Sequence, residues 1–496
     1  WCKSAFTGTL PEIPGPVPNV DPWNPSHDYD YDLIVIGGGS GGLACAKEAM
    51  TINPDLRVCL LDFVKPSPAG SKWGLGGTCV NVGCIPKKLM HTAALYGDYA
   101  RDAALYGWEG GVTKNHSWQT LRDNTQDHIK GLNFGYRVEL REKGISYLNK
   151  LAKFVDAHTL EVSDKKGSKT ITGARIVVAV GGRPSPLQCE GAELAITSDD
   201  LFMKSEAPGK TCVVGAGYVA LECAGFIQGL RQAEVTVLVR SILLRGFDRD
   251  LTATVHSALL HHGVNIREGV MPASISRQDN GRLLVKMTDG SEDEFDTVLA
   301  AVGRYADSPG LNLEAVGVRT DPKNGKIICV NEQSSVPNIY AIGDVVHGVP
   351  ELTPAAIKAG ILLAHRLFAE SRELMDYSKI ATTVFTPLEL GTVGLTEEAA
   401  IDKYGAENVD CVMSSFQPLE WTVAHDNHEG TTCVAKIVIR TDQDKEVLGI
   451  HIAAPNAGEI IQGLAVAFRK GLTHRDLLGT VGIHPTTAEE FTTMKV

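Results

Sequence analysis

The chain has 496 residues, with 47 Lys or Arg against 59 Asp or Glu, so its formal net charge is −12. This acidic balance argues against nucleic acid as a main partner, because a surface that neutralises phosphates needs an excess of cations. No apolar run approaches the ~20 residues that cross a bilayer, and at about 150 residues per domain the length allows roughly three domains.

Residues 1–28 contain six prolines and no hydrophobic periodicity, which predicts a flexible leader. The first residue is Trp1, and a targeting peptide is expected upstream of it. The 11 cysteines are scattered through apolar stretches, unlike those of a disulfide scaffold, so a reducing compartment is expected. The predicted location is mitochondrial, with the cytoplasm as the alternative.

The first motif is a strand, a glycine turn, a helix and a second strand that ends in an acid. The short run 32–36, apolar after Asp32, leads into the glycine-rich segment 37–42, and an apolar helical stretch follows over 43–50. The second apolar run, 58–61, stops at Asp62. This order predicts a βαβ unit of a doubly wound sheet.

The glycines of this turn have separable roles in binding a dinucleotide. Gly37 permits the tight turn, Gly39 lets the backbone approach a pyrophosphate, and Gly42 lets helix and strand pack closely. The phosphates would then meet the positive end of the helix. Asp62 stands where a carboxylate accepts a hydrogen bond from a ribose hydroxyl.

Two cysteines, Cys79 and Cys84, stand five residues apart. Five residues of straight helix rise about 7.5 Å, more than the roughly 4.4–6.8 Å between bridged Cα atoms, so the backbone must bend, at Gly83 and Pro86. A helix beginning near Pro86 would lower the pKa of a nearby thiol, assisted by Lys87. Zinc is the alternative reading, but no second close Cys or His pair completes a ligand set, so no metal is expected.

The βαβ pattern returns in the second part of the chain. Strand residues 211–214 run into Gly215 and Gly217, a helix extends to about residue 230, and a strand follows over 235–239. The chain therefore contains two such units.

The second loop differs from the first at the residues that distinguish one nicotinamide nucleotide from the other. Ala220 takes the place of the third glycine, which is an allowed variant. No acid ends the second strand; Arg240, Ser241 and Arg245 follow instead. Two guanidinium groups with a hydroxyl suit a 2′-phosphate, which predicts NADPH rather than NADH.

From about Asp376 the pattern changes to alternating runs, such as 382–385 and 436–439, which predict an antiparallel sheet. Helices are expected near 458–471 and 487–494. The predicted fold class is therefore α/β, with two Rossmann-like doubly wound nucleotide-binding domains and a C-terminal α+β domain.

From about Tyr29 to its C-terminus the chain resembles the pyridine nucleotide–disulfide oxidoreductase family, which includes glutathione reductase, dihydrolipoamide dehydrogenase and the large thioredoxin reductases. The Cys79-Val80-Asn81-Val82-Gly83-Cys84 segment carries the resemblance most specifically. It implies a glutathione-reductase-like enzyme that passes electrons from NADPH through FAD to these cysteines. The expected domains are a leader over 1–28, an FAD-binding domain over 29–185 and 305–375, an NADPH-binding domain over 186–304 and a dimerisation domain over 376–496.

The resemblance assigns roles at the redox centre. Cys79 would be the interchange thiol that attacks the substrate, and Cys84 would lie against the flavin. Lys87 and Glu222 match an ion pair on the nicotinamide side of the flavin, and Tyr218 matches a tyrosine that swings aside for NADPH.

Further FAD contacts are expected at Thr78 and at Asp344, which matches the residue that binds ribitol. A helix aimed at the flavin is expected to begin with Thr353 as N-cap and Pro354 at the first position. Its positive end would stabilise the anionic reduced flavin.

Near the C-terminus, His484 and Glu489 resemble the acid–base pair of the family, in which the histidine comes from the partner subunit. An obligate homodimer with a shared active site is therefore implied. A neutral imidazole can protonate a leaving thiolate near pH 7. The alternative reading is a helix start, because Thr486 and Glu489 have the spacing of a capping box.

Within the family, the segments 63–74, 132–138 and 239–248 resemble those of the large thioredoxin reductases. Glutathione reductases place two arginines where this chain has Lys47 and Glu48, and a carboxylate there should repel an anionic tripeptide. Thioredoxin is therefore the expected protein substrate.

The large thioredoxin reductases also carry a C-terminal tail with a second redox pair, which receives electrons from the first. The sequence stops at Val496 without one, so we expect that tail to have been removed; the alternative is an enzyme that lacks a tail. The alternative function is glutathione-disulfide reduction. An alternative of another class is a non-catalytic, nucleotide-sensing flavoprotein, which would have no use for the set Cys79, Cys84, His484 and Glu489.

Overall fold

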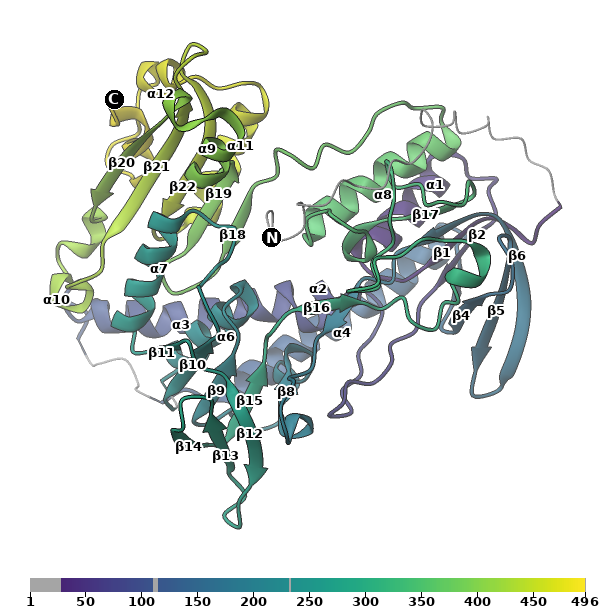
Figure 1. Cartoon of the computed structure of the whole chain (residues 1–496), viewed down its shortest axis with the longest axis horizontal. Coiled ribbons are helices and arrows are strands. Elements are labelled where there is room, and N and C mark those ends of the chain that lie inside the picture. The colour runs from purple at the N-terminus through teal and green to yellow at the C-terminus, as the bar shows by residue number, and fades with distance from the viewer. Residues whose placement is uncertain (1–27, 110–114, 232, 496) are drawn as a thin grey trace.

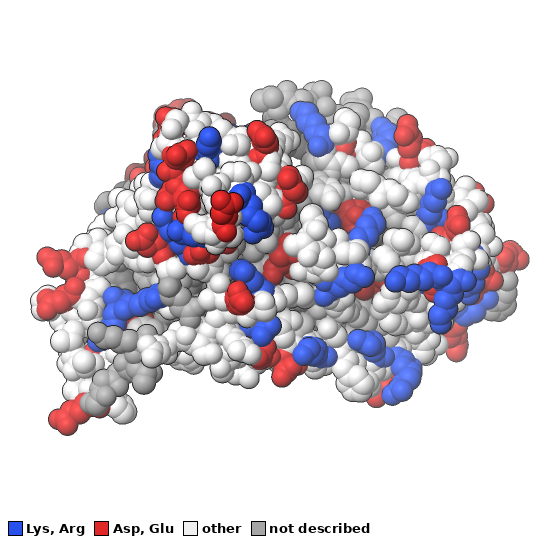
Figure 2. Space-filling model, turned by 90° about the horizontal axis from the view of Figure 1, so that it is seen from below, with Lys and Arg blue, Asp and Glu red and all other residues white. Residues whose placement is uncertain are grey.

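The computed structural model describes residues 28–109, 115–231 and 233–495, so the predicted leader lies outside the described residues except for Asp28. Figure 1 shows two α/β domains, to the right and at the lower centre, and a third domain at the upper left. None of the helices in the described ranges combines the length and apolarity that a membrane span requires. On the face in Figure 2, acidic and basic side chains are interspersed.

The first sheet has seven strands in the order β3-β2-β1-β6-β5-β4, with β17 also paired to β6. Its strands are β1 (Tyr31–Ile36), β2 (Val58–Leu61), β3 (Ser146–Leu148), β4 (Leu151–Phe154), β5 (Thr159–Asp164), β6 (Gly167–Val178) and β17 (Ile339–Ala341). β1, β2, β3, β6 and β17 run parallel, whereas β5 pairs antiparallel with both β6 and β4. The apolar run of β2 is buried throughout, as in the centre of a covered parallel sheet.

The helices of this domain position the redox centre. They are α1 (Ser40–Ile52), α2 (Gly77–Val82), α3 (Cys84–Ala103), α4 (Trp118–Glu142) and α8 (Thr353–Phe368). α1 and α8 approach closely at Gly41 and Gly360, where a Cβ on Gly360 would lie 2.6 Å from the Gly41 carbonyl oxygen. The crossing therefore needs glycine there, although the two positions are far apart in the chain.

The second sheet is entirely parallel, in the order β11-β10-β9-β15-β8. Its strands are β8 (Ile196–Thr197), β9 (Thr211–Val214), β10 (Val235–Val239), β11 (Asn265–Glu268) and β15 (Thr297–Ala300), and its helices are α5 (Ser198–Leu201), α6 (Tyr218–Gly229) and α7 (Arg249–His261). An antiparallel sheet, β12 (Pro272–Arg277), β13 (Leu283–Met287) and β14 (Glu292–Phe295), is inserted before β15. The chain passes between the two domains through β7 (Gly182–Pro184) and β16 (Arg304–Ala306), which pair with each other.

The third domain is built on an antiparallel sheet in the order β18-β19-β22-β21-β20. Its strands are β18 (Thr382–Val384), β19 (Leu390–Gly394), β20 (Val409–Phe416), β21 (Cys433–Arg440) and β22 (Glu446–Ala453). Its helices are α9 (Glu397–Tyr404), α10 (His425–His428), α11 (Ala457–Arg469), α12 (His474–Gly479) and α13 (Glu490–Thr493). Short 3-10 turns complete the chain: η1 (Ala192–Leu194), η2 (Glu314–Val316), η3 (Gly343–Val345), η4 (Ala406–Asn408), η5 (Leu419–Trp421) and η6 (Thr487–Glu489).

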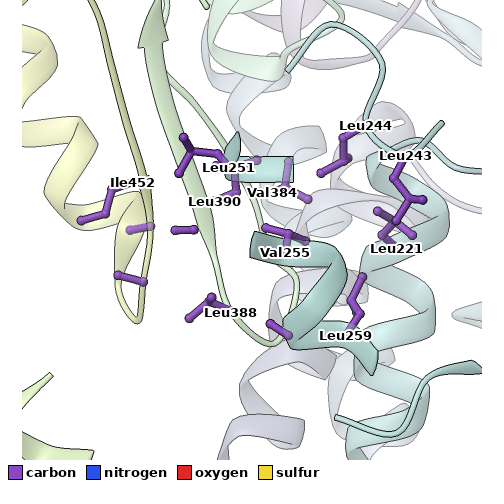
Figure 3. Packing of buried hydrophobic residues seen from close by; sticks show 14 of the residues in the cluster. Leu221, Leu243, Leu244, Leu251, Val255, Leu259, Val384, Leu388, Leu390 and Ile452 are labelled. Carbon is purple, nitrogen blue, oxygen red and sulfur yellow. The ribbon is translucent and has the colours of Figure 1, made fainter. Parts of the chain in front are cut away.

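Helix α7 joins the second and third domains through a shared apolar core. In Figure 3, Leu251 and Val255 of α7 lie between Leu390 of β19 on one side and Leu221 and Leu243 of the second domain on the other. All five side chains are at most 4% exposed. The predicted fold class, two doubly wound α/β domains and an α+β domain, is confirmed.

Candidate active site

The first glycine loop has the backbone geometry that its three roles require. Gly37 has φ +117°, and a Cβ there would lie 2.3 Å from the Ala179 carbonyl oxygen. A Cβ on Gly42 would lie 2.0 Å from the Gly37 carbonyl oxygen, so only glycine lets α1 pack against β1. Around Gly39, by contrast, a Cβ would meet only the Gly77 Cα within 4 Å, at 3.7 Å.

One cleft brings together residues that were predicted from separate parts of the sequence. Its lining includes Gly37, Gly39, Asp62, Thr78, Cys79, Asp344 and Thr353. At one end of it α1 begins without a side-chain cap, so the first backbone N–H groups of the helix point to the cleft. Space at Gly39 together with a bare helix N-terminus fits the pyrophosphate of a dinucleotide.

Two carboxylates in this cleft are perturbed by burial. Burial raises the pKa of Asp62 to about 6, although its carboxylate accepts a hydrogen bond from the Gly38 backbone N–H at 2.9 Å. Burial also raises the pKa of Asp344, against the opposing charges of Arg304 and Lys326. Buried acceptors that lack a full set of donors suit the hydroxyl groups of ribose and ribitol.

The cysteine pair lies across a break between two helices. α2 ends at Val82 and α3 begins at Cys84, because Gly83 adopts φ −143° and ψ −118°. A Cβ on Gly83 would lie 2.9 Å from the Thr78 carbonyl oxygen, so the bend requires glycine. The helix begins at Cys84 itself, two residues before the start expected from Pro86.

Two buried asparagines hold this segment in place, and sequence reasoning missed both. The Asn81 amide donates to the carbonyl oxygens of Gly77, at 2.8 Å, and Gly74, at 3.2 Å. Asn133 of α4 donates to the Leu75 carbonyl oxygen, at 2.6 Å, and to Asn81 Oδ1, at 3.0 Å. α4 therefore fixes the turn that carries Cys79, through a hydrogen bond between two asparagines that are 52 positions apart in the chain.

Both thiols are free in this structure, and their pKa values are shifted in opposite directions. The Cys79 thiol donates to the Cys84 sulfur, which lowers the pKa of Cys84 and raises that of Cys79. Thr353, whose hydroxyl lies 3.7 Å from Cys84 Sγ, and the charge of Lys87 also favour the Cys84 thiolate. The arrangement therefore stabilises one thiolate in a dithiol, as a thiol–disulfide exchange centre requires.

An ion pair connects the cysteine helix to the second domain. Lys87 Nζ lies 2.8 Å from Glu222 Oε1, and the two side chains are 14% and 4% exposed. The same oxygen accepts the Phe385 backbone N–H at 2.8 Å, and Lys87 Nζ lies 4.1 Å from the centre of the Phe385 ring. Tyr218 begins α6 one turn before Glu222, and burial raises its pKa.

We expect the reduced cysteine pair to lose its first proton with an apparent pKa of about 6, well below that of an ordinary thiol. Replacing Lys87 with methionine should raise this pKa, because it removes a positive charge and leaves Glu222 unpaired beside the thiolate. The pH dependence of alkylation of the reduced pair by iodoacetamide measures the shift.

Lys88→Met is the matched control. Lys88 Nζ lies at the same 4.1 Å from the Phe385 ring but pairs with Glu389, at 3.3 Å, rather than with Glu222. Its replacement should leave the alkylation profile nearly unchanged. An equal shift in both variants would show that the ion pair with Glu222 does not set the pKa of the cysteines.

The second glycine loop repeats the geometry of the first. Gly215 has φ +142°, and a Cβ there would lie 2.2 Å from the Ala301 carbonyl oxygen, whereas Gly217 has nothing within 4 Å. Beyond β10, the exposed loop residues Arg240, Ser241 and Arg245 follow, and Arg245 Nη2 donates to Ser241 Oγ at 2.9 Å. A hydroxyl and guanidinium groups are thus present in the loop, as the sequence led us to expect.

The prediction that Thr353 caps α8 is wrong. Leu352 occupies the N-cap position without a side-chain hydrogen bond, and Thr353 is the first helical residue, followed by Pro354. The Thr353 hydroxyl lies beside Cys84 instead. The helix start still faces the cleft, so the correction changes the role of one side chain and not the place of the helix.

At the C-terminus, Glu489 contacts His484 rather than capping a helix. His484 Nδ1 lies 2.9 Å from Glu489 Oε1, whereas the Thr486 hydroxyl donates to the Ile483 carbonyl oxygen and caps nothing. The His484 side chain is 82% exposed. In Figure 1 the end marked C lies at the far end of the third domain from α2, and His484 is not among the residues that line the cleft with Cys79.

The segment 63–74, which was singled out in the sequence only by its resemblance to the large thioredoxin reductases, also reaches the cleft. Phe63, Val64 and Trp73, from the connection after β2, line it together with Arg183. The Arg183 guanidinium lies 4.8 Å from the centre of a ring of Trp73. The described residues contain no group of three or more His, Cys, Asp or Glu side chains that could hold a metal ion.

Comparison with known proteins agrees with this geometry. Residues 31–360 match the pyridine nucleotide-disulphide oxidoreductase family, and residues 380–495 match the dimerisation domain of the same family. The chain belongs to this family. It is therefore a flavin-dependent disulfide oxidoreductase that uses FAD and a nicotinamide nucleotide.

A relative with a named activity shows which members of the family the chain resembles. The chain is 51% identical over 479 residues to thioredoxin reductase SEP1 of Emiliania huxleyi, and the match covers 94% of this chain and 95% of the relative. The similarity thus includes the third domain as well as both nucleotide-binding domains.

Proposed function

We propose that this chain is an NADPH-dependent thioredoxin-disulfide reductase that works as a homodimer. The observation that carries the proposal is the Cys79–Cys84 pair, placed across the Gly83 break with the Thr353 hydroxyl 3.7 Å from Cys84 Sγ, in a setting that lowers the pKa of Cys84. Such a pair can reduce a disulfide in two exchange steps. Bound FAD would supply the electron pair that comes from the nicotinamide nucleotide.

In the first step, Cys79 attacks one sulfur of the substrate disulfide, forms a mixed disulfide and releases the other sulfur as a thiolate. In the second, the Cys84 thiolate attacks the Cys79 sulfur, which releases the second substrate sulfur as a thiolate and leaves Cys79 and Cys84 joined as a disulfide. His484 of the partner subunit would take the Cys79 proton and give it to the leaving thiolate. Glu489, 2.9 Å from His484 Nδ1, would orient the imidazole.

NADPH preference is proposed from the loop after β10. Replacing both Arg240 and Arg245 with glutamine should raise the KM for NADPH by about 10–100-fold, because two charge-assisted hydrogen bonds to the 2′-phosphate are lost. The KM for NADH should stay within about twofold. Arg277→Gln, an exposed arginine on β12 of the same domain, is the control, and a rise in both KM values would contradict the assignment.

Thioredoxin as substrate is supported by the similarity to the relative named thioredoxin reductase SEP1. The structure weakens one reason for rejecting glutathione. Glu48 Oε1 lies 2.8 Å from His365 Nε2, and Lys47 Nζ lies 2.9 Å from Glu139 Oε2, so the carboxylate predicted to repel glutathione has a cationic partner when His365 is protonated. The C-terminal relay tail and the mitochondrial location stay predictions.

The proposal is tested by NADPH oxidation with three oxidants, namely oxidised glutathione, a small aromatic disulfide and thioredoxin. We expect turnover with the aromatic disulfide and little with glutathione. Strong turnover with glutathione would replace the proposal with glutathione-disulfide reductase. Full activity of the 496-residue chain on thioredoxin would show that no relay tail is needed.

A further inference from the structure

A buried lysine joins the third domain to the second. Lys436 lies on β21 with its side chain 2% exposed, and its Nζ lies 3.1 Å from Asp248 Oδ2, 2.6 Å from Asp250 Oδ2 and 2.6 Å from Glu397 Oε2. Glu397 belongs to the third domain, whereas Asp248 and Asp250 lie at the start of α7 in the second. A single cation of the dimerisation domain therefore contacts two acids of the nucleotide-binding domain.

Lys436 carries its charge despite its burial. Burial acts to lower the pKa of its ammonium group, but hydrogen bonds to Asp250 and Glu397 and the charge of Asp248 outweigh burial and raise it. A charge without partners at this depth would be strongly unfavourable. The three carboxylates thus fix where Lys436 lies, and Lys436 in turn fixes them.

The Asp248 carboxylate accepts hydrogen bonds from both the second and the third domain. Its Oδ1 accepts the backbone N–H groups of Asp250, at 3.2 Å, and Leu251, at 3.4 Å, and so caps α7. Its Oδ2 accepts the Glu397 backbone N–H at 3.3 Å, from the third domain. The start of α7 is therefore held to the third domain by hydrogen bonds as well as by charge.

Arg249 stands between these two acids and holds the loop before α7. Its guanidinium donates to the carbonyl oxygens of Leu243, at 3.0 Å, Leu244, at 2.6 Å, and Phe247, at 2.7 Å. Three carbonyls on one planar cation leave this loop little freedom. The same loop carries Arg240, Ser241 and Arg245, whose positions decide whether a 2′-phosphate is bound.

The loop needs such support because its backbone is strained. Leu244 has φ +43°, a left-handed conformation that costs free energy for a branched side chain and persists only when its surroundings enforce it. Its side chain is 1% exposed, and its N–H donates to the Ala216 carbonyl oxygen at 2.8 Å. Ala216 belongs to the second glycine loop, so the two nucleotide-contacting loops are joined at this residue.

We propose that Lys436 is a positioning residue for nucleotide selectivity. Without touching the nucleotide, it fixes Asp248 and Asp250 on either side of Arg249, and Arg249 fixes the loop that receives the 2′-phosphate. The inference rests on the proposed NADPH preference. It assigns part of that preference to the dimerisation domain.

A positioning role of Lys436 and a general structural role predict different effects on nucleotide binding. A loosened loop should weaken ligands that carry a 2′-phosphate far more than those that lack one, because Arg240 and Arg245 are the groups that would bind that phosphate. A loss of stability or of domain alignment would weaken every adenine nucleotide alike.

The test uses the full-length holoenzyme with 2′,5′-ADP and 5′-AMP as competitive inhibitors against NADPH. In Lys436→Met the inhibition constant of 2′,5′-ADP should rise about tenfold, while that of 5′-AMP stays within about twofold. The kcat at saturating NADPH should also stay within about twofold, because Lys436 does not touch the reacting atoms.

Two further variants keep the test decisive. Lys436→Met leaves Asp248, a fully buried carboxylate, without its cation and is expected to lower stability. The double variant Lys436→Met/Asp248→Asn removes both charges and keeps a good N-cap, and should show the same selective loss. Lys210→Met, which breaks a 2.8 Å pair with Asp293 at the opposite end of β9 from the glycine loop, should change neither constant.

Equal weakening of both inhibitors, or no change in the single and the double variant, would overturn the role of Lys436. If the wild-type protein binds 2′,5′-ADP no better than 5′-AMP, the proposed NADPH preference fails, and this inference fails with it. A wild type that discriminates and variants that do so equally well would overturn the inference alone.

Discussion

Cys79→Ser is expected to lower disulfide-dependent NADPH oxidation by at least about 1000-fold, because a serine hydroxyl is not ionised near neutral pH and cannot form the mixed disulfide. The same loss is expected for Cys84→Ser, which leaves the mixed disulfide unresolved. Turnover of a small aromatic disulfide at saturating NADPH measures both.

Cys189→Ser is the matched control, because Cys189 is partly exposed and lies outside the cleft. Its turnover should equal that of the wild type. Turnover that survives in Cys84→Ser would mean that the pair is not the exchange centre. The reading as a nucleotide-sensing flavoprotein would then have to be considered again.

His484→Gln should lower turnover by about 100–10,000-fold, because glutamine cannot exchange a proton with the Cys79 thiol or the leaving thiolate. His425→Gln, at an exposed histidine that also pairs with an acid, should have little effect. Steady-state kinetics over pH 5–9 separates loss of the proton donor from loss of substrate binding, because only the former flattens the profile of kcat.

Mixed dimers test whether His484 acts across the subunit boundary. A dimer of one His484→Gln chain and one Cys79→Ser chain contains one complete site, built from the cysteines of the first chain and the histidine of the second. Random exchange between the two inactive homodimers should therefore restore about a quarter of wild-type activity. No recovery would place His484 in the site of its own chain or outside the mechanism.

The elements that sequence predicted well are those whose chemistry is local. The first glycine loop was predicted correctly because its glycines lie within six positions of one another and one key contact, between Gly42 and Gly37, is local; the close approach of Gly37 to Ala179 could not be read from the loop itself. The bend at Gly83 follows from the spacing of two cysteines and the dimensions of a helix. Where an expected helix or strand is present, the difference lies in the residue at which it begins or ends, as for α3, which begins at Cys84 and not near Pro86.

Contacts between distant segments were found only through the family resemblance or not at all. Lys87 and Glu222 are separated by 135 positions, and nothing in either neighbourhood points to the other. Asn133 and Lys436 read as ordinary polar residues on a helix and a strand, because burial is a property of the fold. Thr353 was predicted to be an N-cap because threonine before proline commonly begins a helix. In the structure its hydroxyl lies beside Cys84 instead.

In the proposed mechanism, electrons from NADPH arrive at Cys79 and Cys84. The most direct measurement is alkylation of the oxidised holoenzyme before and after addition of NADPH without oxygen, with each cysteine located by mass spectrometry. We expect NADPH to add label at Cys79 and Cys84 and at no other cysteine. Unchanged labelling of this pair, or new label at other cysteines instead, would contradict it.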